Sequence, residues 1–290
     1  MQAGTIGQAF DEFLKKKTPK EWEREEVSQC RKRIHDVLDR RYGVYSFFQS
    51  GSFSNGTGIS QKSDVDYFAR LPLDRKTEYP SSLLESMKEA LRENLWEASR
   101  VWISRPTVSI DFNRLVTQYE VTPAFYERLG RGSNEVFLIP GPGNTWRESS
   151  PRAHLNYVHD SNLKHGGKVK GLARLLKAWK YEHDVPISSF YLEMRAAQYG
   201  ASKDSIFYPP ALCDLVRSII NYEARSMNDP MGLVNRITAC SSEQNRSTTL
   251  RKMKNHLPLL ESAYEEWTKD NWMSSQRYRT VFGPDFPQVF

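Results

Sequence analysis

The sequence Ser50-Gly51-Ser52, followed after a short polar segment by Asp64-Val65-Asp66, decides how this chain folds. Residues 44–49 are rich in aromatic and β-branched side chains and therefore predict a strand that ends at the glycine. The glycine allows backbone N–H groups to approach a polyphosphate, and the hydroxyl of Ser52 adds a hydrogen-bond donor. We therefore expect a phosphate-binding turn at this point.

The two aspartates lie two positions apart, so an extended strand points Asp64 and Asp66 to one face and Val65 and Tyr67 to the other. Neighbouring carboxylates, together with substrate phosphates, are the ligands that Mg²⁺ prefers. An Asp-x-Asp pair alone is weak evidence, because solvated surface turns often contain one. Here an apolar strand follows the acids, and residues 53–63 before them are small, polar and few. We therefore favour a nucleotide-polymerising site.

Composition excludes several other classes of protein. A chain of 290 residues can form two modest lobes, and no apolar run approaches the length of a membrane-spanning helix. We expect a soluble, cytoplasmic protein with no membrane partner. The three cysteines are scattered and odd in number, so they predict neither a disulfide framework nor a zinc site. The net charge of +6 is a mild excess that is informative only where basic residues cluster.

The glycine turn and the aspartates together resemble the signature of the polymerase-β-type nucleotidyltransferases. Within them, the chain is most similar to the cGAS/DncV-like nucleotidyltransferases (CD-NTases) of bacterial anti-phage signalling, the CBASS systems. Further segments occur in the order that this family shows, so the resemblance covers roughly residues 20–285. These segments are Val121–Phe125, Phe137–Pro140 with Trp146, Ser149–Pro151 with His154, Arg174–Trp179 and Ser189–Glu193.

The resemblance implies an α+β fold with a polymerase-β-like sheet domain over residues 1–150, a helical lobe over residues 151–290, and the active site in the cleft between them. A long helix that braces the sheet domain is expected from an N-cap at Thr18 to about Arg41, and Gly43 should end it. Other helices are expected near 81–99, 151–163, 168–183, 188–198, 210–224 and 246–270, with strands at 105–113 and 118–125.

Nucleotidyl transfer with two metal ions needs a third carboxylate opposite the Asp-x-Asp pair. Asp111 is a candidate from the residues alone, because it lies on an alternating strand. The resemblance instead implies Glu120, although the family usually has an aspartate at that position. We favour Glu120 and keep Asp111 as the alternative. The expected cofactors are two Mg²⁺ ions, which Mn²⁺ can replace.

Residues 161–181 contain six Lys or Arg residues and no Asp or Glu. On a helix, Lys170, Arg174 and Lys177 share one face, and leucines and a tryptophan share the opposite one. We expect the basic face to point to the cleft and bind NTP phosphates, with Ser189 at the start of the next helix as another donor. The alternative is a surface helix whose lysines lie in water.

The resemblance implies a nucleotidyltransferase that makes a cyclic di- or trinucleotide, or a short linear oligonucleotide, from NTPs with release of pyrophosphate. It implies a product-sensing effector as partner, and we expect a monomer with no obligatory nucleic acid. Ser149 occupies the position where uracil-selecting family members have an amide, so we expect at least one purine in the product. Two alternatives stay open, an RNA 3′-end nucleotidyltransferase and a catalytically inactive nucleotide-binding regulator.

Overall fold

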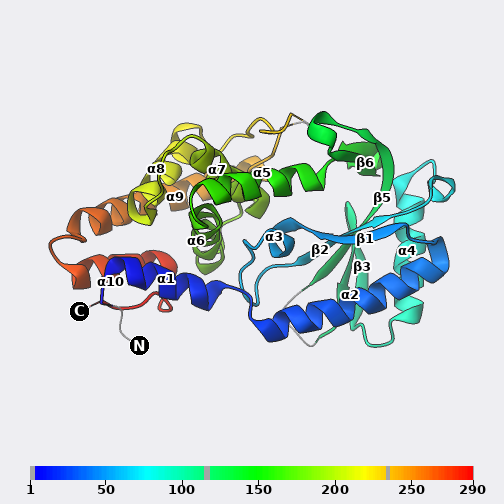
Figure 1. Cartoon of the computed structure of the whole chain (residues 1–290), viewed down its shortest axis with the longest axis horizontal. Helices are drawn as coiled ribbons and strands as arrows, with labels where there is room; N and C mark the ends of the chain where they lie inside the picture. Colours follow the sequence, from blue (N-terminus) through cyan, green and yellow to red (C-terminus); the bar gives the residue numbers. More distant parts are fainter. Residues whose placement is uncertain (1–3, 114–117, 233–235, 290) are drawn as a thin grey trace. The chain divides into compact units, whose positions relative to one another are not determined.

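The structure is a computed structural model, shown in Figure 1, and it describes residues 4–113, 118–232 and 236–289. Its contacts divide the chain into two compact units. The sheet unit is Pro19–Asn156 with a short piece from Met231 onward, and the helical unit is the described part of Met1–Thr18, Tyr157–Pro230 and Asn235–Phe290. The predicted α+β class is confirmed.

These units differ at two places from the domains expected at residues 1–150 and 151–290. Helix α5 (Pro151–Lys164) runs from one unit into the other, so the change falls after Asn156. The residues before Thr18 form α1 (Ile6–Lys17), which contacts α6 (Lys168–Glu182) and α10 (Asn271–Phe282). Because α1 buries its apolar face against these helices, it belongs to the helical unit.

The sheet unit is built on seven strands, counted over the described residues. They are β1 (Ser46–Ser50), β2 (Val65–Arg70), β3 (Arg100–Ser104), β4 (Thr107–Asp111), β5 (Tyr119–Leu129), β6 (Glu135–Pro140) and β7 (Trp146–Ser149). Five of them follow the order β1-β2-β5-β4-β3, while β6 pairs with β5 and β7. Strands β2 and β5 are parallel, and the remaining pairs are antiparallel. The two strands that carry the predicted acids are therefore direct neighbours.

One face of this sheet packs against α2 (Glu21–Tyr42) and α4 (Pro80–Asn94), which lie along the sheet in Figure 1. Side chains of alternate strand residues, such as Tyr67 and Val121, are fully buried in this core. Burial of each large apolar side chain contributes about 1.5–3 kcal/mol. Because strand side chains alternate, the residues between them, including Asp66, point to the opposite face.

Helix α2 has close to its predicted extent, but its N-terminal cap differs. Thr18, expected as the N-cap, ends α1 instead, and its Oγ1 donates to the carbonyl of Leu14 at 2.7 Å. Lys20 is the N-cap, and its N–H donates to the Glu23 carboxylate at 2.7 Å. The expectation for Thr18 is wrong because the residues before it already form a helix. Gly43 ends α2 with a φ of 71°, as predicted.

The elements expected at residues 81–99 and 105–113 are divided differently in the structure. Helix α4 ends at Asn94, and the residues after it lead into β3, which forms a hairpin with β4. The turn of this hairpin contains Pro106, whose missing N–H cannot join a strand ladder. The predicted single strand is therefore the second half of a hairpin.

The helical unit also contains α7 (Ser189–Ala201), α8 (Tyr208–Asn221) and α9 (Glu243–Glu266). Helix α6 is its centre, since it contacts α1, α7, α8 and α10. Aromatic rings of α1, α10 and the C-terminal segment pack together, with Phe10 at 4.9 Å from Tyr278 and 5.1 Å from Phe286 between ring centroids. Within the residues that the structure describes, no helix is long and apolar enough to cross a membrane.

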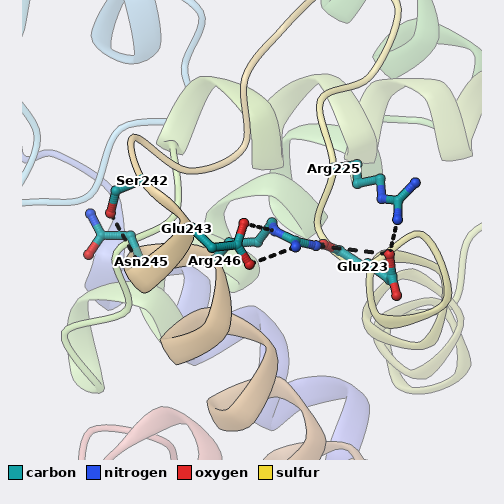
Figure 2. A network of polar contacts seen from close by, with 6 residues as sticks. All are labelled: Glu223, Arg225, Ser242, Glu243, Asn245 and Arg246. Atoms are coloured by element: carbon teal, nitrogen blue, oxygen red, sulfur yellow. Dashed lines mark hydrogen bonds and ion pairs between the residues drawn. The ribbon is translucent and has the colours of Figure 1, made fainter.

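Ion pairs connect the end of α8 to the start of α9, as Figure 2 shows. Arg246 holds Glu243 in a bidentate pair with N–O distances of 2.8 and 2.7 Å, and it donates to the carbonyl of Glu223 at 3.0 Å. Glu223 also pairs with Arg225. Most of these side chains are well exposed, so each pair contributes little to stability.

Candidate active site

The predicted catalytic acids lie on one face of two neighbouring strands. Asp66 of β2 is in register with Ser50 of β1 on one side and with Glu120 of β5 on the other. Asp64 directly precedes β2, two positions from Asp66, so its side chain lies on the same face. Strand pairing therefore brings Glu120 beside the aspartates, although it is far from them in the sequence.

Gly51 begins a short helix, α3 (Gly51–Ser54), directly after β1. Its φ of 65° lies in the left-handed region, which strains a residue with a side chain. A Cβ atom at this position would lie 1.9 Å from Oδ2 of Asp66, so the Asp66 carboxylate occupies the space that a side chain would fill. The half-buried Ser52 closes the turn, because its carbonyl accepts the N–H of Thr57 at 2.9 Å. The placement of Asp66 thus depends on the glycine.

Glu120 lies in surroundings that suit a cation-binding site. Burial raises the pKa of its carboxyl and the nearby Asp64 carboxylate raises it further, while the hydrogen bond from the Gln118 amide opposes the rise. The Gln118 amide donates to Oε1 of Glu120 at 2.8 Å. Carboxylates held close together repel each other, and a bound cation removes that repulsion.

Asp111, the alternative third acid, lies one strand farther from the aspartates. Strand β5 separates its strand, β4, from β2. Its Oδ1 accepts the backbone N–H of Asn113 at 2.8 Å, a bond typical of an aspartate that begins a turn. Of the two candidates, only Glu120 lies on a strand that pairs directly with β2.

Among the described residues, no group of three or more His, Cys, Asp or Glu side chains is gathered closely enough to hold a metal ion. The Asp66 carboxylate rests against Gly51, and Gln118 holds the Glu120 carboxylate. The type of ligand still fits Mg²⁺, because Asp64, Asp66 and Glu120 supply only carboxylate oxygens from one face of the sheet. Metal binding would require the Glu120 carboxylate to exchange its contact with Gln118.

Two of the three basic residues that the sequence predicts to share one face of α6 are buried. Arg174 is 9% exposed and Lys177 is 1% exposed, so both are buried together with the leucines. Lys177 forms an ion pair with Glu193 of α7, which is also buried. Lys170 alone of the three predicted residues is half-buried. Arg174 and Lys177 therefore do not lie in water, as the alternative of a surface helix requires, because α6 contacts four other helices. The binding of phosphate by these residues stays a prediction.

Ser189 is the first residue of α7 and is half-buried. Its Oγ accepts a hydrogen bond of 2.8 Å from the Nζ of Lys180, on the last turn of α6. The sequence pattern did not single out Lys180, although this residue is one of the six basic residues in the acid-free stretch. Lys180 and Ser189 therefore form a pair that the sequence analysis missed.

Ser149, the predicted base-selecting residue, lies on β7 in register with Phe137 of β6. It is half-buried, and the next residue, Ser150, donates its hydroxyl to the carbonyl of Glu135 at 2.7 Å. These contacts hold the end of β7 against β6. A role of Ser149 in base selection stays a prediction.

Glu23 is a further residue that the sequence analysis missed. It is 2% exposed, and its carboxylate accepts hydrogen bonds from Oγ of Ser60 at 2.8 Å and from the N–H of Gln61 at 2.9 Å. It thereby fixes the segment between the glycine turn and the aspartates to the start of α2. A glutamate in the first turn of a helix is a cap signal, but nothing in the sequence connects it to a distant loop.

Solved structures of nucleotidyltransferases share the fold of this chain. The cyclic AMP-GMP synthase DncV of Vibrio cholerae, solved with the linear intermediate pppA(3′,5′)pG, matches with a TM-score of 0.78, 13% identity, and 99% and 98% coverage of this chain and of DncV. CdnC of Escherichia coli MS115-1, solved with ATP, matches with a TM-score of 0.76, 16% identity, and 98% and 99% coverage. At such low identity these similarities establish the fold.

Two curated relatives are similar in sequence. A "Probable cyclic nucleotide synthase" of Bacillus cereus is 22% identical over 180 residues, 60% of this chain, and the chain spans only 54% of the length of that relative. A cyclic AMP-AMP-AMP synthase of an Acinetobacter species is 22% identical over 277 residues. The match covers 88% of this chain and 76% of the length of that relative.

The domain described as "Second Messenger Oligonucleotide or Dinucleotide Synthetase" (SMODS) matches residues 5–162, more than half of the chain and the part that contains Gly51, Asp64, Asp66 and Glu120. The resemblance found in the sequence is thereby confirmed. This chain belongs to the family of second messenger oligonucleotide or dinucleotide synthetases and has the fold of the nucleotidyltransferase DncV.

Proposed function

We propose that this chain joins nucleoside triphosphates into a cyclic or short linear oligonucleotide that serves as a second messenger. One observation carries the proposal: the register of β2 and β5 puts residues Asp66 and Glu120 directly beside each other, next to Asp64 and the Gly51 turn. The family supports the same reaction class. In each step a ribose hydroxyl oxygen bonds to the α-phosphorus of an NTP, the bond to pyrophosphate breaks, and the hydroxyl proton passes to a base.

Asp64, Asp66 and Glu120 would hold two Mg²⁺ ions, with Mn²⁺ as a replacement. When bound, these ions supply Lewis-acid activation and neutralise charge on the phosphates. Glu120, or a water molecule, would accept the proton of the attacking hydroxyl. Asp64 and Asp66 need no proton transfer for their role.

The Gly51 turn would bind the polyphosphate. A residue without a side chain allows the phosphate oxygens to approach backbone N–H groups, and the Ser52 hydroxyl provides a further donor. Ser189, and the basic residues Lys170, Arg174 and Lys177 predicted from the sequence, would also contact phosphates. The burial of Lys177 with Glu193 makes it the weakest member of this set.

The product would contain at least one purine. The short side chain of Ser149 leaves room for one, and the relative from Acinetobacter makes a cyclic product of adenosine units only. The antiviral setting rests on the family resemblance, and so does an effector protein that senses the product. The chain would act as a monomer in the cytoplasm, where NTPs are abundant, although CdnC has been solved in complex with a HORMA protein.

Incubation of the full chain with Mg²⁺ and all four NTPs, with and without RNA, tests the proposal. We expect pyrophosphate release without RNA, together with an oligonucleotide product. Digestion of this product and mass spectrometry then identify its nucleosides. Activity only with RNA, and extension of that RNA, would identify a 3′-end nucleotidyltransferase. Binding of NTP without any pyrophosphate release would identify an inactive regulator.

A further inference from the structure

The three predicted acids differ in how the sheet holds them. Asp66 and Glu120 each pair with a neighbouring strand on both sides, so the strand ladder fixes the position of both residues. Asp64 precedes Val65, the first residue of β2 that pairs with β5. The direction of the Asp64 side chain therefore depends on how the preceding segment, residues 59–63, leads into the strand.

Residues 59–63 form a compact turn. The carbonyl of Ile59 accepts the N–H groups of Lys62 at 3.1 Å and of Ser63 at 3.0 Å, and the N–H of Ile59 donates to Oγ of Ser63 at 2.8 Å. Ile59 and Ser63 are both buried. Gln61, within the turn, has a φ of 58°, in the left-handed region that residues with a side chain rarely adopt. Such a conformation persists only where the surrounding structure holds it.

Glu23 of α2 holds this turn from outside. Its side chain is buried, and its Oε1 accepts the N–H of Gln61 at 2.9 Å. Its Oε2 accepts the hydroxyl of Ser60 at 2.8 Å and the N–H of Lys20, the N-cap of α2, at 2.7 Å. A carboxylate can accept all three bonds because each oxygen has two lone pairs. One side chain thus caps the helix and fixes the turn that leads to Asp64.

We propose that Glu23 is a positioning residue for the metal site: by holding Ser60 and Gln61, it sets the course of the chain into β2 and places the Asp64 carboxylate beside Asp66. The inference rests on the proposed function, in which Asp64 holds Mg²⁺. In this role Glu23 contacts neither metal nor substrate and acts through Asp64. A ligand that is placed in advance loses less conformational freedom when the metal binds, so metal affinity should depend on Glu23.

One substitution separates the two tasks of Glu23. A glutamine can replace the glutamate of a capping box, so in Glu23→Gln the amide oxygen can still accept the N–H of Lys20. The amide nitrogen would then face the N–H of Gln61, and two donors cannot form a bond. The matched control is Glu97→Gln, which removes another carboxylate that ties α2 to a neighbouring segment, through an ion pair with Arg33.

Binding of Mn²⁺ without turnover tests this role. Electron paramagnetic resonance measures it in the presence of an equal mixture of the four NTP analogues that have a methylene bridge between the α- and β-phosphorus and cannot release pyrophosphate. We expect Glu23→Gln to weaken Mn²⁺ binding about tenfold, as the loss of a residue that orients a metal ligand does. Ser60→Ala, which leaves the helix cap intact, should cause a smaller loss, and Glu97→Gln should bind Mn²⁺ like the wild type.

Two further measurements distinguish positioning from a general loss of structure. In the metal-free protein, the backbone amides of residues 59–65 should exchange with solvent faster in Glu23→Gln than in the wild type, while the unfolding temperatures stay close. Added to Asp64→Asn, the substitution Glu23→Gln should weaken Mn²⁺ binding no further, because Glu23 acts through Asp64.

Mn²⁺ binding at wild-type strength in both Glu23→Gln and Ser60→Ala would overturn the inference while leaving the proposed function intact. An equal loss in Glu97→Gln, or a further loss when Glu23→Gln is added to Asp64→Asn, would also overturn it, because Glu23 would then not act through Asp64. If the wild-type chain released no pyrophosphate from NTPs, the proposed function would fail, and this inference with it.

Discussion

The sequence assigned two sets of residues to the reaction, one on strands β2 and β5 and the other on helix α6. The two sets differ in their surroundings in the structure. On the strands, the alternation of side chains and the parallel pairing place Asp66 and Glu120 side by side. On α6, the spacing of the basic residues predicts a shared face that points to the cleft, and Arg174 and Lys177 of that face are buried. The spacing predicted the shared face of the acids on the strands, but on α6 it did not indicate how deeply the basic residues are buried.

The two sets differ because a strand and a helix have different numbers of neighbouring elements. A strand in a sheet has two neighbours in the plane and two faces, so alternation alone separates core from solvent, as Tyr67 and Asp66 show. A helix can pack on several sides, and α6 contacts α1, α7, α8 and α10. A charged residue on such a helix is buried with a partner, as Lys177 is with Glu193. Helical periodicity therefore gives the direction of a side chain but not its exposure.

The largest effect should come from the aspartates of the sheet unit. We expect Asp64→Asn and Asp66→Asn each to lower pyrophosphate release at least about 1,000-fold, because each removes a proposed metal ligand. Their unfolding temperatures should stay close to that of the wild type, since Asp64 is exposed and Asp66 is half-buried. Asp74→Asn, at an exposed position of the same unit, is the control and should keep full activity. Turnover of more than a few per cent of the wild type in either catalytic variant would disprove the assignment.

The glycine turn provides a matched pair of substitutions. Gly51 and Gly143 both have a φ of 65°, but a Cβ atom would collide with Asp66 at Gly51 and would have nothing within 4 Å at Gly143. We expect Gly51→Ala to lower turnover about 100-fold, because Asp66 must move. Gly143→Ala should cost about 1 kcal/mol of stability from strain alone and keep its turnover. Equal losses of turnover in both variants would show that backbone strain, and not the contact with Asp66, explains why position 51 requires glycine.

The buried ion pair of the helical unit should affect stability. We expect Lys177→Met to lower the free energy of unfolding by about 3–5 kcal/mol, because it leaves the Glu193 carboxylate buried without its counter-charge. The double variant Lys177→Met with Glu193→Leu should regain most of that loss, since an apolar pair can replace a buried ion pair. Urea unfolding measures both. A single variant as stable as the wild type would mean that Lys177 does not hold the two helices together.

The exposed ion pairs of Figure 2 should have the smallest effect. Arg246→Met removes the bidentate contact with Glu243, but water already solvates both side chains. We expect the unfolding temperature to change by no more than about 2 °C, and the change to shrink as salt is added. A loss of stability as large as that of Lys177→Met would show that burial does not determine how much an ion pair in this unit contributes to stability.

Much of the sheet unit could be predicted from the sequence because its signals are local. Gly51 marks the turn, the spacing of Asp64 and Asp66 gives their common face, and Gly43 ends α2. The neighbour of Asp66 could not be derived from spacing, because strand pairing joins residues that are distant in the sequence. Glu120 was favoured only through a family resemblance.

Contacts between distant segments account for the residues that sequence reasoning missed. The bond between Lys180 and Ser189 depends on how α6 meets α7, and the hold of Glu23 on Ser60 and Gln61 depends on where a loop returns to α2. The grouping of α1 with the helical unit also depends on distant partners. None of these contacts produces a period or a motif in the sequence.

One measurement tests the account most directly: pyrophosphate release by Glu120→Gln and Asp111→Asn, side by side under saturating Mg²⁺. If strand pairing defines the site, Glu120→Gln should lose as much turnover as Asp66→Asn, because Glu120 lies beside Asp66 on the paired strand. Asp111→Asn should stay within about twofold of the wild type, since β5 separates it from β2 and an amide oxygen can still accept from Asn113. Loss of turnover in Asp111→Asn with activity kept in Glu120→Gln would contradict the account and move the third carboxylate to β4.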